Sequence, residues 1–282
     1  MRKYLLSVFL WLALTGSGLT QCDSMTLSEA GSLLNRDTFY NLREQALRHM
    51  DSCLWSMAKK GETIPKNIPE LFELHAPDSS FTLYSYRFRV HSALFSYRAI
   101  LKKQDNTYLL KKDSVNKDDL NKNMRYSQDN WYGAIYFNLI DKKISGKNYY
   151  FLFGYRDLDA RENQKLIDVL WFDDNGEPQL GASHFDLPNF ENALRFYFNY
   201  GEMGAAKLNY DPYKNLILKD HLIVSVVNGI PVLLPDGSYE ALEWKKKKWR
   251  YIEKVYDEVL EEAPRPVPLK RDKKDLFGND IK

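Results

Sequence analysis

Residues 82–90 have the sequence TLYSYRFRV. Every second side chain in this stretch is apolar or aromatic: Tyr84, Tyr86, Phe88 and Val90. Such a period of two is typical of a β-strand, because successive side chains of a strand point to opposite faces of its sheet. The next run, from Phe95 to Leu101, alternates in the same way. A short connection between consecutive strands indicates an antiparallel pair.

Outward from this pair, β-branched and aromatic residues dominate further runs that are separated by turn residues. They predict strands at 131–140, 148–155, 165–172, 194–200, 215–218 and 222–227, and two more within 239–255. Turns are expected at 141–147, 173–176, 211–212, 235–237 and 245–248, and a long polar loop at 116–130. Short connections favour antiparallel hairpins over parallel crossovers. We therefore expect a mainly antiparallel β meander, folded as a sandwich or open barrel.

A helix is expected before the strands, over residues 37–60. Its apolar side chains recur at steps of three and four: Phe39, Leu42, Ala46, Met50, Cys53, Leu54 and Met57. Asp37 is suited to the N-cap and Gly61 to the C-terminal stop. The fold class is thus α+β. The expected organisation is a signal peptide (1–20), an N-terminal helical segment (21–70), an antiparallel β-rich domain (71–256) and a charged, proline-containing tail (257–282).

The first twenty residues have the three parts of a secretory signal. Arg2 and Lys3 precede the apolar run LLSVFLWLAL at 5–14, and small residues follow up to the expected cut between Thr20 and Gln21. The mature protein is then exported, periplasmic or extracellular, and carries no integral membrane span. A lipid anchor on Cys22 is the less favoured alternative, because Gln21 stands where that signal requires a small residue.

The charge balance argues against a nucleic-acid partner. The chain has 40 Lys and Arg against 38 Asp and Glu, and removal of residues 1–20 takes away two of the basic residues, leaving equal numbers. A protein that binds polyanions normally shows a basic excess.

Cys22 and Cys53 are the two cysteines of the chain. In an oxidising compartment they either form a disulfide, which would tie the mature N-terminus to the first helix, or remain separate, with Cys53 acting as a small buried hydrophobic residue. The sequence slightly favours the bridge.

Motifs for the common chemistries are missing, so we expect no cofactor, no metal and no catalytic residues. The chain has no glycine-rich phosphate loop, and its five histidines show no metal-ligand spacing. A calcium loop starting at Asp157 would need a turn residue where Glu162 stands. Asp168 lies within an apolar strand and is expected on its solvent face. Ser183 and His184 are neighbours on one strand and so point to opposite faces.

The aromatic residues offer a binding interpretation. Trp131 and Tyr132, Tyr149 and Tyr150, and Tyr197 could present rings to a ligand. The alternative, which we favour, is that these rings form the core and cross-strand pairs. The ligand-binding residues remain unknown from the sequence.

Several short segments resemble a family of uncharacterised secreted or envelope proteins of Gram-negative bacteria. These are WYGAIY (131–136), KLIDVL (165–170), FDDNG (172–176), DHL (220–222) and PDGSYEAL (235–242). The resemblance extends over about 75–255 and implies no activity and no site residue. The function expected is that of a non-enzymatic binding or envelope-associated protein with an unknown protein or small ligand as partner. The alternatives are an extracytoplasmic hydrolase acting on glycans or peptides, and an envelope assembly factor.

Overall fold

A computed structural model describes residues 25–36, 39–91, 94–253 and 255. Within them, two helices precede the strands: α1 (Leu27–Leu33) and α2 (Tyr40–Lys60). The helix-side sheet has the strand order β1-β2-β3-β4. Its strands are β1 (Phe72–His75), β2 (Thr82–His91), β3 (Leu94–Lys103) and β4 (Asn106–Lys112).

Two more sheets follow along the chain. A short 3-10 helix, η1 (Lys117–Asp119), leads to the middle sheet, which has the order β11-β7-β6-β5 with β8 added to β7. Its strands are β5 (Ile135–Ile144), β6 (Lys147–Asp157), β7 (Glu162–Phe172), β8 (Pro178–Leu180) and β11 (Phe196–Gly201). The outer sheet has the order β10-β9-β15-β14-β13-β12. Its strands are β9 (Phe185–Leu187), β10 (Phe190–Ala193), β12 (Leu208–Asp211), β13 (Leu216–Val227), β14 (Ile230–Lys245) and β15 (Lys248–Ile252).

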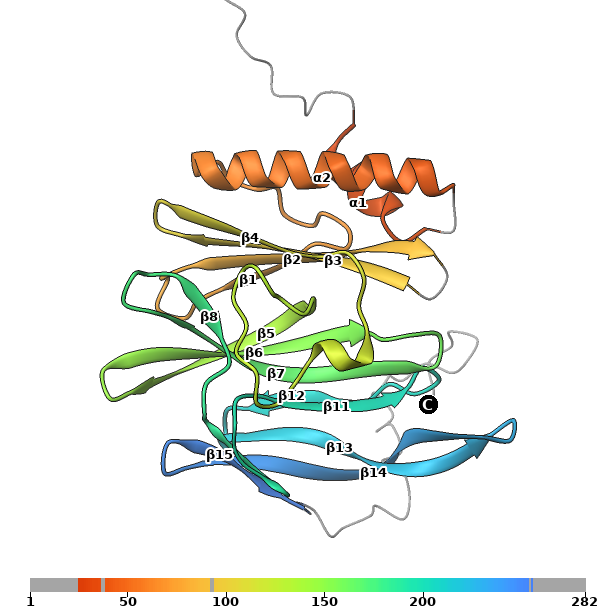
Figure 1. Cartoon of the computed structure of the whole chain (residues 1–282), viewed down its shortest axis with the longest axis vertical. Helices are drawn as coiled ribbons and strands as arrows, with labels where there is room; N and C mark the ends of the chain where they lie inside the picture. The colour runs from red at the N-terminus through yellow and green to blue at the C-terminus, as the bar shows by residue number, and fades with distance from the viewer. Residues whose placement is uncertain (1–24, 37–38, 92–93, 254, 256–282) are drawn as a thin grey trace, which may run out of the picture.

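The elements form a stack of layers, with α2 above the helix-side sheet, then the middle sheet, then the outer sheet (Figure 1). Each junction is filled by its own apolar cluster. Helix residues such as Met50 and Leu54 pack on Tyr86 and Phe88 of β2. The middle sheet meets the outer sheet through a second cluster that includes Trp249.

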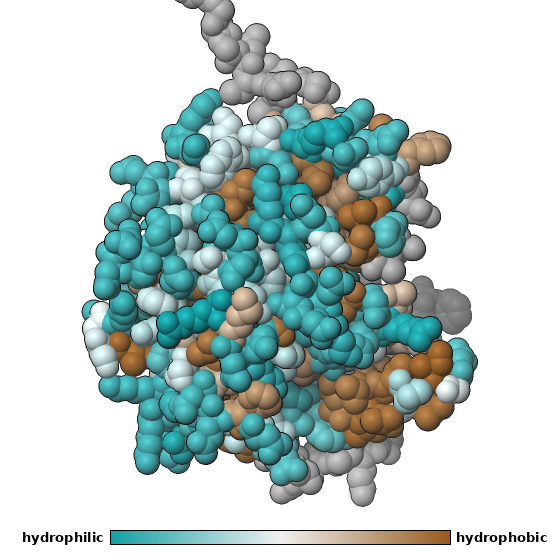
Figure 2. Space-filling view, viewed as in Figure 1, coloured by the Kyte–Doolittle hydropathy of each residue, from teal (hydrophilic) through white to brown (hydrophobic). Residues whose placement is uncertain are grey.

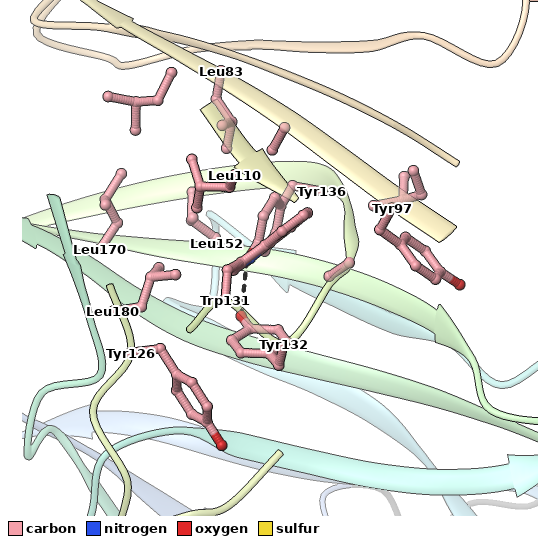
Figure 3. Packing of buried hydrophobic residues seen from close by; sticks show 14 of the residues in the cluster. Leu83, Tyr97, Leu110, Tyr126, Trp131, Tyr132, Tyr136, Leu152, Leu170 and Leu180 are labelled. Atoms are coloured by element: carbon pink, nitrogen blue, oxygen red, sulfur yellow. Dashed lines mark hydrogen bonds between the residues drawn. The ribbon is translucent and has the colours of Figure 1, made fainter. Parts of the chain in front are cut away.

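The junction between the helix-side and middle sheets contains leucines and a group of aromatic rings (Figure 3). Trp131 donates its indole N–H to the hydroxyl of Tyr136 at 3.1 Å. Tyr132 hydrogen bonds the same hydroxyl at 2.8 Å. The middle sheet is therefore covered on both faces, and its long strands β6 and β7 are buried over most of their length.

The expected mainly antiparallel β fold with an N-terminal helix is confirmed. Among the named strands, only the pairing of β15 with β9 is parallel. The finer expectation of a sandwich or open barrel was incomplete, because three sheets stack. The helix ends as predicted at Gly61, which takes the left-handed conformation with φ of 69°. The helix begins at Tyr40 with Phe39 as its N-cap, so the expected cap at Asp37 was wrong. The signal peptide and the tail lie outside the described residues.

One turn prediction was wrong. The segment 235–237 is not a chain reversal but lies inside β14, near a register shift opposite Asp220 and Leu222. The true reversal is Asn228-Gly229, where both residues have positive φ, 50° and 76°. Consequently the two short strands expected at 215–218 and 222–227 are one strand, β13.

Candidate binding surface

Asp168 does not face solvent, as the sequence suggested, because the middle sheet has no solvent face at this point. Its side chain is fully buried and pairs with Arg195, also fully buried, at 3.2 Å. Burial alone would lower the pKa of Arg195, but the carboxylate of Asp168 outweighs it and raises that pKa above its ordinary value. Arg195 also donates to the backbone carbonyls of Asn121, Met124 and Leu180. This pair therefore holds the 116–130 loop onto the middle sheet.

The aromatic candidates lie mainly in the core. Trp131, Tyr132 and Tyr150 are 2%, 1% and 2% exposed. Tyr149 packs its ring edge-on against His184, with centroids 4.5 Å apart. Tyr197 is half-buried, and the ammonium group of Lys122 lies 5.3 Å from its ring centre. None of these five rings is a bare, exposed platform.

The acidic residues named for a calcium loop are occupied elsewhere. The Asp157 carboxylate accepts hydrogen bonds from Tyr97 at 2.8 Å and from Tyr155, and forms an ion pair with Arg87. Within the described residues, no group of three or more Asp, Glu, His or Cys is placed to hold a metal ion.

A cavity of about 940 Å³ lies between α2 and the edge of the helix-side sheet. Asp51 supplies its only carboxylate among the lining residues. That carboxylate accepts from the Tyr86 hydroxyl at 2.6 Å and from Arg98 at 3.3 Å. It therefore joins the helix to the sheet, and no second acid converges on it as glycoside hydrolysis would require.

A denser polar cluster lies where β13 and β14 shift register. The imidazole of His221 is 2.9 Å from Asp236 and 3.8 Å from Glu240. Ser238 donates its hydroxyl to Asp236 at 2.7 Å. A serine hydrolase needs the hydroxyl on the imidazole, whereas here the carboxylate stands between the two groups. The cluster therefore braces the strands and lacks the geometry of an activated nucleophile.

Cys53 is buried on α2 within hydrogen-bond range of His49. Cys22 lies outside the described residues, so the disulfide between them stays a prediction.

The feature that stands out is a hairpin of the outer sheet. Beyond the register shift, β13 and β14 continue together as a two-stranded ribbon over Leu222–Pro235, which we call the apolar hairpin. Its sequence, LIVSVVNGIPVLLP, contains no charged residue.

Its side chains are exposed to an unusual degree. Val226 and Val224 are 72% and 67% exposed, and Ile223, Ile230 and Leu233 are at least one-third exposed. Figure 2 shows them as a contiguous hydrophobic area at the lower right, where Figure 1 places the end of the β13–β14 hairpin. Exposed patches of this kind mark sites of interaction on soluble proteins.

The hairpin is anchored at one side by close backbone contact. A Cβ added to Gly204 would lie 2.8 Å from the Leu234 side chain, and one added to Gly201 would lie 3.3 Å from Cβ of Val232. Glycine at both positions leaves room for the hairpin side chains to pack against the end of β11 and the residues after it. A hollow of about 350 Å³ lies between the ribbon and the turn that joins β6 to β7. Apolar hairpin residues such as Val224 and Leu233 line one side of it, and charged residues such as Arg161 line the other.

Sequence reasoning found part of this surface, the strand at 222–227, but missed the hairpin. Two local signals could have found it: the pair Asn228-Gly229, which favours a two-residue hairpin turn, and the fourteen-residue stretch without charge.

Comparison with family models, with curated proteins and with solved structures finds no match for the chain. Of the helices in the described residues, none is both long and apolar enough to cross a membrane. The resemblance to the secreted family stays a prediction, and the function has to be argued from the geometry.

Proposed function

We propose that the protein is an exported, envelope-associated binding protein that engages its partner through the apolar hairpin. The observation that carries this proposal is the exposure of Val224 and Val226, 67% and 72%, on an uncharged ribbon that projects from the outer sheet. Burying one such side chain contributes about 1.5–3 kcal/mol, so a partner that covers the ribbon would gain a favourable binding free energy.

The polar groups of the interior support the same proposal. The buried Asp168 pairs with Arg195 and holds the 116–130 loop to the middle sheet. The half-buried Asp157 is held by Arg87 and Tyr97 of the helix-side sheet, so it joins two layers. The signal-like N-terminus supports export. The residues that come closest to a hydrolase site are His221, Asp236 and Glu240. The Ser238 hydroxyl beside them donates to Asp236 and not to the imidazole, so His221 does not activate a nucleophile.

A site-specific photocrosslinker tests the binding surface. The chain is expressed with its leader in a Gram-negative host, with a benzoyl-phenylalanine at Val226 or, as a control, at Tyr213, which is 98% exposed outside the hairpin. We expect a discrete crosslinked species from position 226 and none from position 213. Equal labelling at both positions, or none at 226, would contradict the proposal.

Export is tested separately by sequencing the N-terminus of the protein recovered from the envelope and the medium. We expect it to begin at Gln21. A protein retained in the cytoplasm with Met1 in place would refute the export part while leaving the hairpin experiment valid.

A further inference from the structure

The turn of the apolar hairpin fixes the direction of every backbone group in it. Asn228 and Gly229 both have positive φ, and Val227 is paired with Ile230, which is a two-residue turn of type I′. The pair that flanks such a turn is hydrogen-bonded, and the pairs then alternate between bonded and non-bonded. The backbone N–H and C=O groups of the non-bonded pairs face away from the ribbon.

Those outward-facing positions are different on the two strands. The non-bonded pairs are Val226 with Pro231, Val224 with Leu233, and Leu222 with Pro235. On β14, two of the three outward positions are prolines, which have no N–H to offer. The third, Leu233, has its carbonyl oxygen 3.4 Å from the Cβ position of Gly201, in the body of the protein. Prolines at these positions are a known protection against strand addition.

Beyond the hairpin, the N–H of Val255 donates to the carbonyl of Tyr239 on the same strand, β14, at 3.2 Å. The β14 edge of the ribbon is therefore closed by proline and lies next to the body of the protein.

The β13 edge is open. The pairing of β12 with β13 stops at Leu208 with Lys219. Leu222, Val224 and Val226 on β13 have no strand beyond them among the described residues, and their outward N–H and C=O groups have no backbone partner there. The side chains of these three residues lie on one face of the ribbon. The edge therefore offers a row of backbone donors and acceptors that is flanked by apolar side chains.

We infer that two copies of the chain pair antiparallel through their β13 edges, centred on Val224. In this arrangement Val224 meets its symmetry mate, and Leu222 meets Val226 of the other copy. Each copy contributes the N–H and C=O groups of the same three residues, so every outward donor finds an acceptor. The inference rests on the proposed function and names a second copy as the partner.

Two physical reasons favour a second copy over a lipid surface or an open fibre. Unpaired backbone groups are costly in hydrocarbon, so an open edge is poorly suited to insertion into a bilayer. Pairing about a twofold axis consumes the open edge of the apolar hairpin in each copy, and its proline-containing edge cannot continue the sheet, so pairing through the hairpins closes as a dimer.

The test is sedimentation equilibrium of residues 21–282 over a range of concentrations, with a matched pair of variants. Val224→Pro removes an outward N–H from the β13 edge, and Leu233→Pro removes the one directly opposite on the β14 edge. The ribbon already accepts proline at two equivalent positions. We expect concentration-dependent dimers for the wild type and Leu233→Pro, and monomers for Val224→Pro. Thermal unfolding checks that both variants fold.

Amide hydrogen exchange of the wild type gives a second measurement that needs no variant. The N–H groups of Leu222, Val224 and Val226 should exchange more slowly as the concentration rises. A wild type that is monomeric throughout, or a Val224→Pro protein that still dimerises, would overturn the inference.

Lipid or the C-terminal tail at the β13 edge would each give a different result. Flotation of the monomer with phosphatidylethanolamine–phosphatidylglycerol vesicles would replace the second copy by lipid. Protection of these amides that is independent of concentration and lost on deletion of 257–282 would replace it by the tail. A monomer that still crosslinks another molecule from position 226 would refute the dimer and preserve the proposed function.

Discussion

Asp168 on β7 and Arg195, just before β11, form an ion pair at 3.2 Å in which neither side chain is exposed to solvent. The pair lies in the middle sheet, which is covered on both faces. Arg195 reaches from it to the backbone carbonyls of the 116–130 loop, so that one charged pair fixes a long irregular segment to the centre of the stack.

Replacing one member of this pair should be strongly destabilising. For Asp168→Ala we expect a loss of about 3–5 kcal/mol in the free energy of unfolding, because Arg195 is left as an uncompensated buried charge. Urea unfolding measures it. Asp168→Ala combined with Arg195→Leu should cost less than the two single changes added together, since it removes both charges. Full additivity would mean that the two residues are not coupled.

Gly181 is predicted to resist substitution. Its φ is 100°, and a Cβ would lie 2.6 Å from Nη2 of Arg195. Gly181→Ala should therefore lower the free energy of unfolding by more than about 1 kcal/mol, through backbone strain and displacement of the guanidinium. Gly146→Ala, with φ of 86° and open space around it, carries strain alone and is the control. A smaller effect at Gly181 than at Gly146 would contradict the contact with Arg195.

The contact between α2 and the helix-side sheet should depend on Asp51. Asp51→Ala leaves the buried Tyr86 hydroxyl without its 2.6 Å acceptor, which is expected to cost about 1–3 kcal/mol. Tyr86→Phe removes the hydroxyl itself and should cost about 1 kcal/mol. Chemical denaturation of the two variants gives the comparison, and the reverse order of their costs would rule out the hydroxyl as the cause.

The pKa of Asp236 should be low. Hydrogen bonds from the Ser238 hydroxyl and backbone, together with His221, lower the pKa of this exposed carboxyl from 3.8 to about 2. Because the folded pKa lies below the unfolded one, its contribution to stability is present above about pH 4 and is lost as the pH falls toward 2. NMR titration of the Asp236 carboxyl carbon measures the midpoint.

Ser238→Ala should move that midpoint upward by more than His221→Gln does, since the serine is the largest cause of the lowered pKa. An Asp236 midpoint near 4 in the wild type would show that these hydrogen bonds are not kept in solution.

The state of the cysteines is open to direct measurement. If Cys22 and Cys53 are bridged in the exported protein, intact mass should show two hydrogens fewer than the reduced chain from Gln21, and reduction should lower the melting temperature. A diacylglyceryl mass on Cys22 would instead establish the lipid anchor. Two thiols that react freely after unfolding would exclude the bridge.

Features controlled by neighbours in the chain could be predicted from the sequence. The alternation in 82–90 gave a strand because side-chain direction in an extended chain has a period of two whatever lies around it. The helix ends at Gly61 because the left-handed conformation at that position is nearly free for glycine. The antiparallel order of most strands follows likewise from short connections, which cannot span a parallel crossover.

Features controlled by what covers each face needed the tertiary structure. Alternation alone cannot distinguish a strand with one wet face from a strand between two sheets, so Asp168 was predicted on the surface although its sheet is covered on both sides. The hairpin shows the opposite case. An apolar strand predicts burial, but Val224 and Val226 stay exposed on a ribbon that runs past the paired ends of β12 and β15. Whether a side chain is buried depends on residues far away in the sequence. The composition of a segment indicates only how much free energy its burial would contribute.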